Sequence, residues 1–393
     1  MIRKLKNYDF TLMITPILLA AFGIVMIYSA SMVVAVVNGN EPTFYLVRQL
    51  RSFVIGMVGF VITCIIPYKT YQKLVKLISL VMIGMLVYVL INGHSEGNAT
   101  RWFSLGPMTI QPSEFVKIGL IIYLASVYSK KQEYISDFGK AVLPPLVLMG
   151  IILALILKQP DVGTAATILL IGSTIIFSSG IRFRHLFLLS AVGVIVVAIA
   201  IPNMVTETRI ERFTGAYQPF EAPDDGGHHL IQSYLAISGG GLSGEGLGQS
   251  VQKLGYLFGA HTDFIMSIVA EELGFIGVFI VIGMLAIIVL RGFFIARKCE
   301  DSFGALMAIG ISAMVGIQAS INLGAISGIL PITGVTLPFI SYGGSSLMVL
   351  LISMGILNNI AMQTKKDEAD VQPKESVTKP VMLKQRGGRS WSS

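Results

Sequence analysis

The stretch 253–274, KLGYLFGAHTDFIMSIVAEELG, decides the fold, because a long polar loop becomes an apolar helix within it. Asp263 lies at the junction, where polar sequence gives way to FIM. Glu271 and Glu272 follow about two turns later, roughly 12–14 Å further along a helix that rises 1.5 Å per residue. Ionisable side chains inside a membrane span are costly, so carboxylates at these positions are candidates for a function.

The bulk composition indicates a membrane protein. Of the 393 residues, 53% are hydrophobic and 13% are charged, and the mean hydropathy is +0.74. Soluble domains carry about 25% charged residues, so this balance predicts an integral membrane protein. The apolar runs are long and repeated, which excludes an outer-membrane barrel with its short alternating segments. Cys64 and Cys299 lie in unlike settings and indicate neither a disulfide framework nor a metal site.

Long apolar runs divide the chain into candidate spans. The first run is too long for the apolar part of a cleaved signal peptide, so it is interpreted as a span. We therefore expect an all-α integral membrane protein, a polytopic bundle of about ten transmembrane helices. The candidate spans are 11–37, 52–67, 74–92, 112–129, 141–157, 162–180, 184–201, 263–290, 303–327 and 339–362.

The distribution of Lys and Arg predicts the orientation. These residues are about twice as frequent in one set of connections as in the other, which indicates that both termini are cytoplasmic. The largest connection, about 202–262, is then an extracellular loop, and a loop of this length is usually functional or disordered. Residues 1–362 form one membrane domain, and residues 363–393 form a basic, disordered tail. The basic charge thus reflects topology, and no nucleic-acid partner is expected.

Two interpretations of Asp263 stand side by side. As a helix cap, it would accept amide hydrogen bonds at the positive end of the helix dipole. As a general base, it would deprotonate a hydroxyl on a lipid-anchored substrate at the membrane surface. Glu271 and Glu272 lie deeper and on different faces of the helix from Asp263. We expect both glutamates to be structural, with at least one paired to a polar group on a neighbouring span.

Other charged residues cluster near predicted span ends. Glu114 and Lys117 are spaced i,i+3, which favours a structural ion pair that could also line a polar cavity. Arg101 beside Trp102 suits a phosphate and a sugar, although Trp102 alone is also typical of the membrane interface. Asp161 starts a span, where capping is the simpler role.

Two further stretches bear on the site. Lys253 precedes Asp263 by ten residues and is a candidate to meet a diphosphate. The run 331–346, PITGVTLPFISYGGSS, includes Ser341 and is rich in proline and glycine, so it must be irregular. Irregular backbone at membrane depth is tolerated only where protein or a water-filled cavity covers it.

Four stretches together resemble one family. They are RWFSLGPMTIQPSEFVK (101–117), KQPDVGTA (158–165), AHTDFIMSIVAEELG (260–274) and LPITGVTLPFISYGGSS (330–346). In this order they resemble the family that contains FtsW, RodA and SpoVE, and within it the FtsW branch of Gram-positive bacteria. The resemblance covers the chain apart from its tail.

The resemblance implies a peptidoglycan glycosyltransferase of the bacterial cytoplasmic membrane. It implies polymerisation of lipid II (undecaprenyl-diphospho-disaccharide-pentapeptide) on the extracellular face. The implied partners are a class B penicillin-binding protein and other proteins of the division machinery. The essential Asp of the family's H-T-D-F segment maps onto Asp263, next to His261. Trp102 and Lys117 fall on positions the family needs, and Glu114 is the ion-pair partner.

One departure lies beside Asp263. The family commonly has Y-L-P-E-x-H-T-D, whereas Phe258 and Gly259 replace the proline and glutamate here. This puts the loop geometry, the level of activity or the choice of partner in question, and leaves the family unaffected.

The mechanism expected from this resemblance is an inverting sugar transfer. Asp263 removes a proton from the 4-hydroxyl of the acceptor GlcNAc, whose oxygen attacks C1 of the donor MurNAc and displaces undecaprenyl diphosphate. Arg101, Lys253 or a divalent cation such as Mg²⁺ or Mn²⁺ would balance the diphosphate charge. Arg101, Trp102, Glu114, Lys117, Asp161, Lys253, His261 and Ser341 are the expected substrate-binding or supporting residues.

Two other functional classes stay open from the sequence. Buried charges and broken helices also fit a transporter that flips lipid-linked precursors. A scaffold that only recruits division proteins would not need Asp263. Roles in division, elongation or sporulation are not separated by these motifs.

Overall fold

The computed structural model describes residues 8–96, 99–106, 108–132, 142–181, 214–221 and 226–371, together with residues 137, 139 and 223. The predicted span 184–201, the first part of the predicted 202–262 loop and the tail beyond 371 lie outside the described residues.

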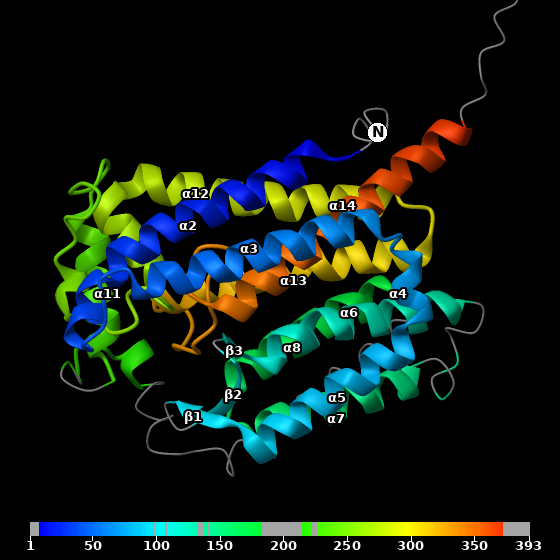
Figure 1. Cartoon of the computed structure of the whole chain (residues 1–393), viewed down its shortest axis with the longest axis horizontal. Helices are drawn as coiled ribbons and strands as arrows, with labels where there is room; N and C mark the ends of the chain where they lie inside the picture. The colour runs from blue at the N-terminus through cyan, green and yellow to red at the C-terminus, as the bar shows by residue number, and fades with distance from the viewer. Residues whose placement is uncertain are drawn as a thin grey trace, which may run out of the picture.

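The described chain is a bundle of helices with one small sheet (Figure 1). Its helices are α2 (Phe10–Val37), α3 (Phe44–Ile65), α4 (Lys69–Lys73), α5 (Val75–Asn92), α6 (Pro112–Lys130), α7 (Leu143–Leu157), α8 (Val162–Ser178), α11 (His228–Gly239), the 3-10 helix η3 (Gln252–Leu254), α12 (Ile265–Lys298), α13 (Ser302–Ile326) and α14 (Gly344–Val371). Strands β1 (His94–Glu96), β2 (Ala99–Leu105) and β3 (Met108–Ile110) form an antiparallel sheet in the order β1-β2-β3.

The predicted fold class is confirmed. Six of the described helices are long and apolar enough to cross a membrane: α2, α3, α5, α12, α13 and α14. Helices α6, α7 and α8 occupy three further predicted spans. The small sheet was not predicted, because its short strands lie in a connection between two spans. The chain is therefore a helical, multi-pass membrane bundle.

Some helix ends differ from the predicted spans for identifiable reasons. Helix α3 begins at Phe44, whereas the predicted span began at 52. The prediction started late because Arg48, Gln49 and Arg51 interrupt the apolar run in the first turns of the helix. Helix α14 begins at Gly344 rather than 339, after an irregular segment, and continues past 362 to Val371. The predicted tail is therefore helical over its first turns.

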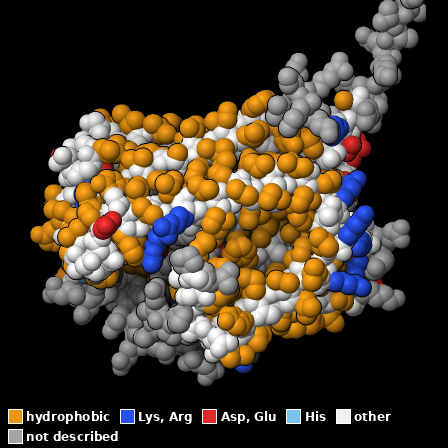
Figure 2. Space-filling view, viewed as in Figure 1, with side chains coloured by type: hydrophobic (Ala, Val, Ile, Leu, Met, Phe, Trp, Pro, Cys, Tyr) orange, Lys and Arg blue, Asp and Glu red, His pale blue; other side chains and the backbone are white. Residues whose placement is uncertain are grey.

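The bundle has two distinct ends (Figure 1). The start of α2, the short helix α4 and the end of α14 lie at one end, here called the terminal end. Helix α11, the start of α12 and the sheet lie towards the other, here called the loop end. Figure 2 shows apolar side chains along the length of the bundle, with Lys and Arg gathered at the terminal end. A second group of basic side chains lies near the loop end, over α3.

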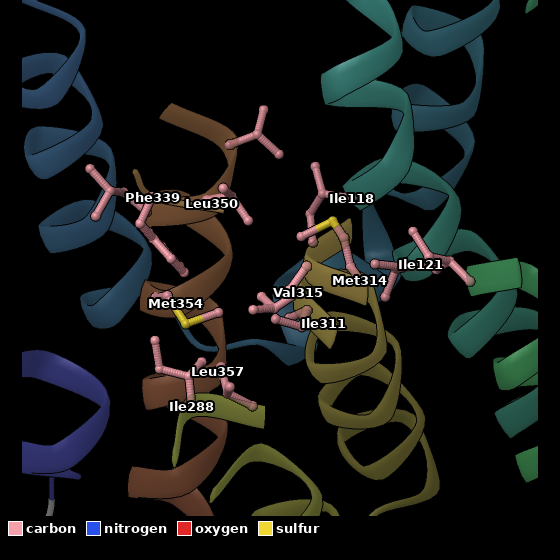
Figure 3. Close-up of a cluster of buried hydrophobic side chains, with 14 of the residues drawn as sticks. Ile118, Ile121, Ile288, Ile311, Met314, Val315, Phe339, Leu350, Met354 and Leu357 are labelled. Carbon is pink, nitrogen blue, oxygen red and sulfur yellow. The ribbon is translucent and has the colours of Figure 1, made fainter. Parts of the chain in front are cut away.

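Helices α13 and α14 form the centre of the bundle. In the 18-residue apolar stretch of α14, 94% is buried inside the protein. The corresponding stretch of α5 is 17% buried, because α5 lies at the periphery. Ile118 and Ile121 of α6 face Met314 of α13, and Leu350 and Met354 of α14 complete the cluster (Figure 3). Close packing of these side chains holds the helix ends that carry the candidate site.

Helix α12 is broken at Gly274. This residue has φ 64° and ψ −163°, a conformation that glycine adopts without steric cost. The loop 240–246 bonds to the interrupted backbone: Phe275 N donates to Gly241 O (2.9 Å) and Glu245 N donates to Glu271 O (2.9 Å). A Cβ at Gly274 would collide with the backbone of Gly244. The break thus anchors the loop that leads to Asp263.

Candidate active site

Asp263 lies in the loop immediately before α12. The N-cap residue of α12 is Phe264, so Asp263 is not the helix cap that one interpretation of the sequence proposed. Its side chain is half-buried. A Cβ placed on Gly334 would lie 3.7 Å from Asp263 Oδ2 and 3.9 Å from Arg101 Nη1. The carboxylate and the guanidinium therefore face the same small space beside Gly334.

The backbone of Asp263 is held by Asn322, a residue of α13 that the sequence analysis missed. Asn322 is buried, and its Nδ2 donates to Asp263 O (2.8 Å) and to Val335 O (2.9 Å). One amide group thus ties the start of α12 to the irregular segment 331–343. An amide inside the apolar span 303–327 was the available signal, since polar side chains within spans usually bond to neighbouring elements.

His261 is held by two tyrosines. Its ring centroid lies 4.6 Å from that of Tyr45 on α3 and 5.7 Å from that of Tyr342. Tyr342 N donates to His261 O (2.9 Å), so the backbone is fixed as well. Burial lowers the pKa of His261 to about 4, because the charged ring would lose its hydration. The imidazole is therefore neutral at pH 7 and serves as an aromatic support for the Asp263 loop.

Arg101 and Asp161 form an ion pair next to Asp263. Arg101 Nε lies 3.6 Å from Asp161 Oδ2, and the arginine side chain is 24% exposed while that of Asp161 is 2% exposed. Asp161 also caps α8, as its position predicted: it accepts from Thr164 N (3.2 Å) and Thr164 Oγ1 (2.8 Å). The rigid carboxylate fixes the guanidinium: Nη2 donates to Pro160 O (3.5 Å), and Nη1 faces the space beside Gly334.

Trp102 follows Arg101 in β2 and is half-buried. Successive side chains of a strand point to opposite faces, so Trp102 lies on the face of β2 away from the Arg101–Asp161 pair. Phe103, on the same face as Arg101, packs edge-on against Tyr88 of α5 at 5.4 Å. A role of Trp102 in binding substrate therefore stays a prediction.

Lys253 lies elsewhere than expected. Its Nζ is buried and donates to Glu272 Oε1 (2.7 Å) and to Ser29 Oγ of α2 (2.9 Å). This ammonium is enclosed in a buried ion pair, so the prediction that Lys253 meets a diphosphate is wrong in this structure. The residue supports the loop instead, by fixing η3 to α2 and α12.

The predicted structural role of the two glutamates is confirmed. Glu272 pairs with Lys253 and accepts from Ser29 Oγ (2.7 Å), a polar group on a neighbouring span. Glu271 accepts from Ser250 Oγ and from Val251 N (2.8 Å). Both carboxylates therefore bind the loop that precedes Asp263.

Glu114 and Lys117 form the predicted ion pair at the start of α6. Lys117 Nζ lies 2.8 Å from Glu114 Oε1, and both residues are buried. Glu114 Oε2 has no hydrogen-bond partner among the described residues. A buried acceptor of this kind needs a donor, so the pair is compatible with the lining of a polar cavity.

Ser341 closes a turn in the irregular segment. Its buried Oγ accepts from Leu337 N (2.8 Å), and its carbonyl accepts from Gln49 Nε2 (3.4 Å). Within this turn Phe339 has φ 67°, a strained conformation for a side chain of its size. Ser341 therefore shapes the segment that carries Gly334 and Tyr342.

No group of three or more His, Cys, Asp or Glu side chains in the described ranges is arranged to hold a metal ion. Asp161 is already engaged by Arg101 and the start of α8. The described residues therefore offer no preformed metal site of protein ligands alone.

Comparison with known proteins decides the family. The family of cell cycle proteins that includes FtsW, RodA and SpoVE matches residues 10–366. The chain belongs to this family. It is similar to the probable peptidoglycan glycosyltransferase FtsW of Bacillus subtilis (strain 168), at 48% identity over 98% of each chain. It is also similar to stage V sporulation protein E of the same organism, at 36% identity over 93% of this chain and 100% of that one.

Solved structures agree with this membership. A chain of a peptidoglycan synthase complex that coordinates polymerization and crosslinking matches with TM-score 0.75 and 28% identity, over 92% of this chain and 99% of that chain. The rod shape determining protein RodA of Thermus thermophilus matches with TM-score 0.65 and 28% identity, over 90% and 96%. The family predicted from the four sequence motifs is thus confirmed, and the curated names do not favour the flippase alternative.

Proposed function

We propose that this chain is a peptidoglycan glycosyltransferase that polymerises lipid II into β-1,4-linked glycan strands, with Asp263 as the general base. The observation that carries the proposal is the position of Asp263. Its half-buried carboxylate shares one small space with the guanidinium of Arg101 at the loop end of a membrane bundle. A substrate anchored in the membrane by its lipid would present its diphosphate and sugars at this level.

The proposed step is a glycosyl transfer with inversion at C1 of the donor. Asp263 accepts the proton from the 4-hydroxyl of the acceptor GlcNAc, and the oxygen forms a new bond to C1 of the donor MurNAc. The bond from C1 to the diphosphate oxygen breaks, and undecaprenyl diphosphate leaves with the electron pair. Inversion of the α-linked donor gives the β-1,4 bond. A positioned carboxylate base of this kind contributes about 10²–10⁴-fold in rate.

Arg101 supports this step through its charge. Negative charge grows on the leaving diphosphate in the transition state, and fixed donors aimed at that charge lower the barrier. The ion pair with Asp161 holds the guanidinium in place, so little reorganisation is needed when the charge develops. Arg101 thus replaces Lys253 as the described cation beside the reaction centre.

The proposed orientation puts both termini in the cytoplasm and the loop end outside. The excess of Lys and Arg in connections at the terminal end supports it, since such residues are retained on the cytoplasmic side. Asp263 then faces the extracellular side of the cytoplasmic membrane. Peptidoglycan is assembled on that side.

The proposed partner is a class B penicillin-binding protein, together with other division proteins. The likeness to a chain of a synthase complex that couples polymerization and crosslinking supports it. The similarity to a protein named FtsW supports a role in division rather than in elongation or sporulation.

The involvement of a divalent cation in the reaction stays a prediction. Because no three-residue metal site occurs among the described side chains, such an ion would arrive with the diphosphate, whose oxygens are ligands that Mg²⁺ and Mn²⁺ prefer. Polymerisation measured in EDTA and then with added Mg²⁺ or Mn²⁺ tests this point directly.

The deciding experiment measures glycan polymerisation from labelled lipid II. Purified protein is paired with its cognate transpeptidase, whose own active-site serine is disabled. Wild type, Asp263→Asn and Glu245→Gln are compared. Glu245 is an exposed carboxylate of the same loop, so its substitution makes a matched change of charge away from the site.

Polymer from wild type and Glu245→Gln, with none from a folded Asp263→Asn protein, supports the proposal. Equal polymer from all three proteins refutes Asp263 as the base. Absence of polymer in every case, with lipid II still crossing vesicle membranes, would identify a transporter instead.

A further inference from the structure

A basic pocket opens near the loop end, separate from the Arg101–Asp161 pair. It is lined by Arg48, Arg51 and Ser52 of α3, by Met108 and Thr109 of β3, and by Tyr342. We propose that Arg48 and Arg51 bind the diphosphate of the acceptor substrate, as a second anion site distinct from the one beside Asp263. This inference rests on the proposed function, because it assigns one subsite of that reaction.

The two arginines carry charge that the protein does not compensate. Both are exposed, and no carboxylate of the described residues lies within ion-pair distance of either one. Arg48 packs its guanidinium over the ring of Phe44 at 4.1 Å, which directs the side chain without neutralising it. Arginine also presents a planar fork of donors that matches phosphate geometry.

The contrast with Arg101 strengthens the assignment. Arg101 faces Asp161 at 3.6 Å, so the charge of that guanidinium is already compensated before substrate binds. Arg48 and Arg51 are one turn apart on one helix, and their two positive charges suit the two phosphates of a diphosphate. Thr109 adds a hydroxyl donor at the same pocket, whereas Ser52 Oγ already donates to Arg48 O (3.2 Å).

The pocket is joined to the Asp263 loop by direct contacts. Tyr342, which lines the pocket, packs on His261 at 5.7 Å, and its N–H donates to His261 O (2.9 Å). Tyr45, one turn before Arg48, packs on the same imidazole at 4.6 Å. Gln49 accepts from Gly343 N (3.3 Å), which fixes this turn of α3 to the segment that follows Tyr342.

The chemistry of the reaction requires two anion sites at different distances from the base. The donor diphosphate leaves from the carbon under attack, so it lies beside Asp263 and Arg101. The acceptor attacks through the 4-hydroxyl of its outer sugar, so its diphosphate lies one disaccharide away from the base. The pocket at Arg48 and Arg51 is linked to the Asp263 loop through Tyr342 and His261, and we assign it to this second position.

The same arginines could instead hold the phosphate of a bulk membrane lipid. The shared chemistry is a lipid-linked phosphate, and the test must separate the two sources. Binding is therefore measured in an Asp263→Asn background, which stops turnover, in nanodiscs of phosphatidylcholine alone and in nanodiscs that contain phosphatidylglycerol. Native mass spectrometry counts the bound lipid II and phosphatidylglycerol molecules.

Three further variants are made in that background. Arg48→Gln with Arg51→Gln removes both charges, and Arg48→Lys with Arg51→Lys keeps them. Lys158→Gln removes an exposed cation at the end of α7, far from α3 in sequence and not in the pocket. In the otherwise wild-type chain, the same substitutions are compared for KM and kcat in polymerisation.

We expect two lipid II molecules on the parent protein and one on the double glutamine variant. We also expect KM to rise by about tenfold to a hundredfold, because each lost charged contact costs on the order of a factor of ten. The lysine variant retains part of the binding, and Lys158→Gln behaves as the parent. Unchanged lipid II binding in the glutamine variant, with loss of phosphatidylglycerol alone, overturns the proposal in favour of a bulk lipid site.

The two proposals fail separately. If wild type makes no polymer but binds two lipid II molecules, one through Arg48 and Arg51, the glycosyltransferase assignment fails and the anion site stands. If polymer is made and the glutamine variant binds and turns over lipid II as the wild type does, only the anion site fails.

Discussion

Asp263 and the Glu271–Glu272 pair lie in one short stretch of sequence, yet the protein surrounds them differently. Both glutamates are buried, and their oxygens accept hydrogen bonds from protein donors, among them Lys253 Nζ at 2.7 Å and Val251 N at 2.8 Å. Asp263 is half-buried and faces a space shared with the guanidinium of Arg101. The two glutamates hold the loop, and Asp263 faces the position proposed for substrate.

The difference shows how a membrane protein can carry several acids in one helix start. A buried charge is tolerated when a partner and further hydrogen bonds replace its hydration. The glutamates meet this condition through the loop 250–253 and α2. That bonding holds the loop that leads to Asp263 against the first part of α12, before the break at Gly274.

The largest expected effect separates the two regions directly. Glu272→Gln leaves the buried ammonium of Lys253 without its carboxylate, and breaking such a pair costs about 3–5 kcal/mol of the free energy of unfolding. Thermal unfolding of purified protein in detergent measures this loss. Asp263→Asn is the matched control and should lose less stability, because this carboxylate is only half-buried. Equal losses of stability in Glu272→Gln and Asp263→Asn would show that the two regions do not differ in this way.

The next effect concerns pH and the support of Asp263. Burial lowers the pKa of His261 from 6.5 to about 4, so the unfolded chain binds a proton more readily between these values. His261 therefore does not reduce the free energy of unfolding above pH 6.5. As the pH drops towards 4, the free energy of unfolding falls by up to roughly 3 kcal/mol, at 1.36 kcal/mol per pH unit. Melting temperatures from pH 8 to pH 4 test this. In His261→Phe that slope should flatten, and an unchanged slope would assign it to other groups.

A smaller effect is expected at Asn322, which holds Asp263 from α13. Asn322→Ala leaves the carbonyls of Asp263 and Val335 without their donor, at a cost of about 1–3 kcal/mol. The loop should then misplace the base, so kcat falls while KM for lipid II stays near the wild-type value. Asn322→Asp keeps the shape but not the donors and should behave like alanine. Wild-type kcat in Asn322→Asp would show that these hydrogen bonds do not position Asp263.

The smallest effect addresses the departure from the family pattern. Gly259 has φ +72°, and its carbonyl accepts from Thr262 N (3.0 Å) and Phe264 N (3.1 Å), which closes the turn before α12. Gly259→Ala should cost about 1–2 kcal/mol, because a side chain is disfavoured in this conformation. Gly283→Ala, at an open helical position, is the control and should cost nothing measurable. Equal stability of both variants would show that the turn does not need glycine.

Several features of the site could be predicted from the sequence because they are local. The i,i+3 spacing of Glu114 and Lys117 places them on one helix face whatever surrounds the helix, and the pair forms at 2.8 Å. Asp161 caps α8 because it directly precedes the apolar run. The apolar runs themselves predicted the helices, with errors where Arg48 and Gln49 sit inside the first turns of α3.

Other features depend on contacts between distant segments. Lys253 is ten residues from Asp263 in sequence, but its partners are Glu272, 19 residues later, and Ser29, 224 residues earlier. Asn322 reaches Asp263 across 59 positions of the chain. No spacing rule connects such pairs, since the packing of α2, α12 and α13 decides which polar groups meet.

The sequence by itself determined that the chain is a helical membrane protein, which family it belongs to, and that Asp263 lies at a span end. Hydrophobic runs and local motifs are enough for these conclusions, because they depend on residues adjacent along the chain. Only the tertiary structure decided which cations are available to an anion. It encloses Lys253 with Glu272, sets Arg101 against Asp161, and leaves Arg48 and Arg51 exposed beside Tyr342. The physical reason is that charge compensation depends on distance in space, which packing fixes and sequence order does not.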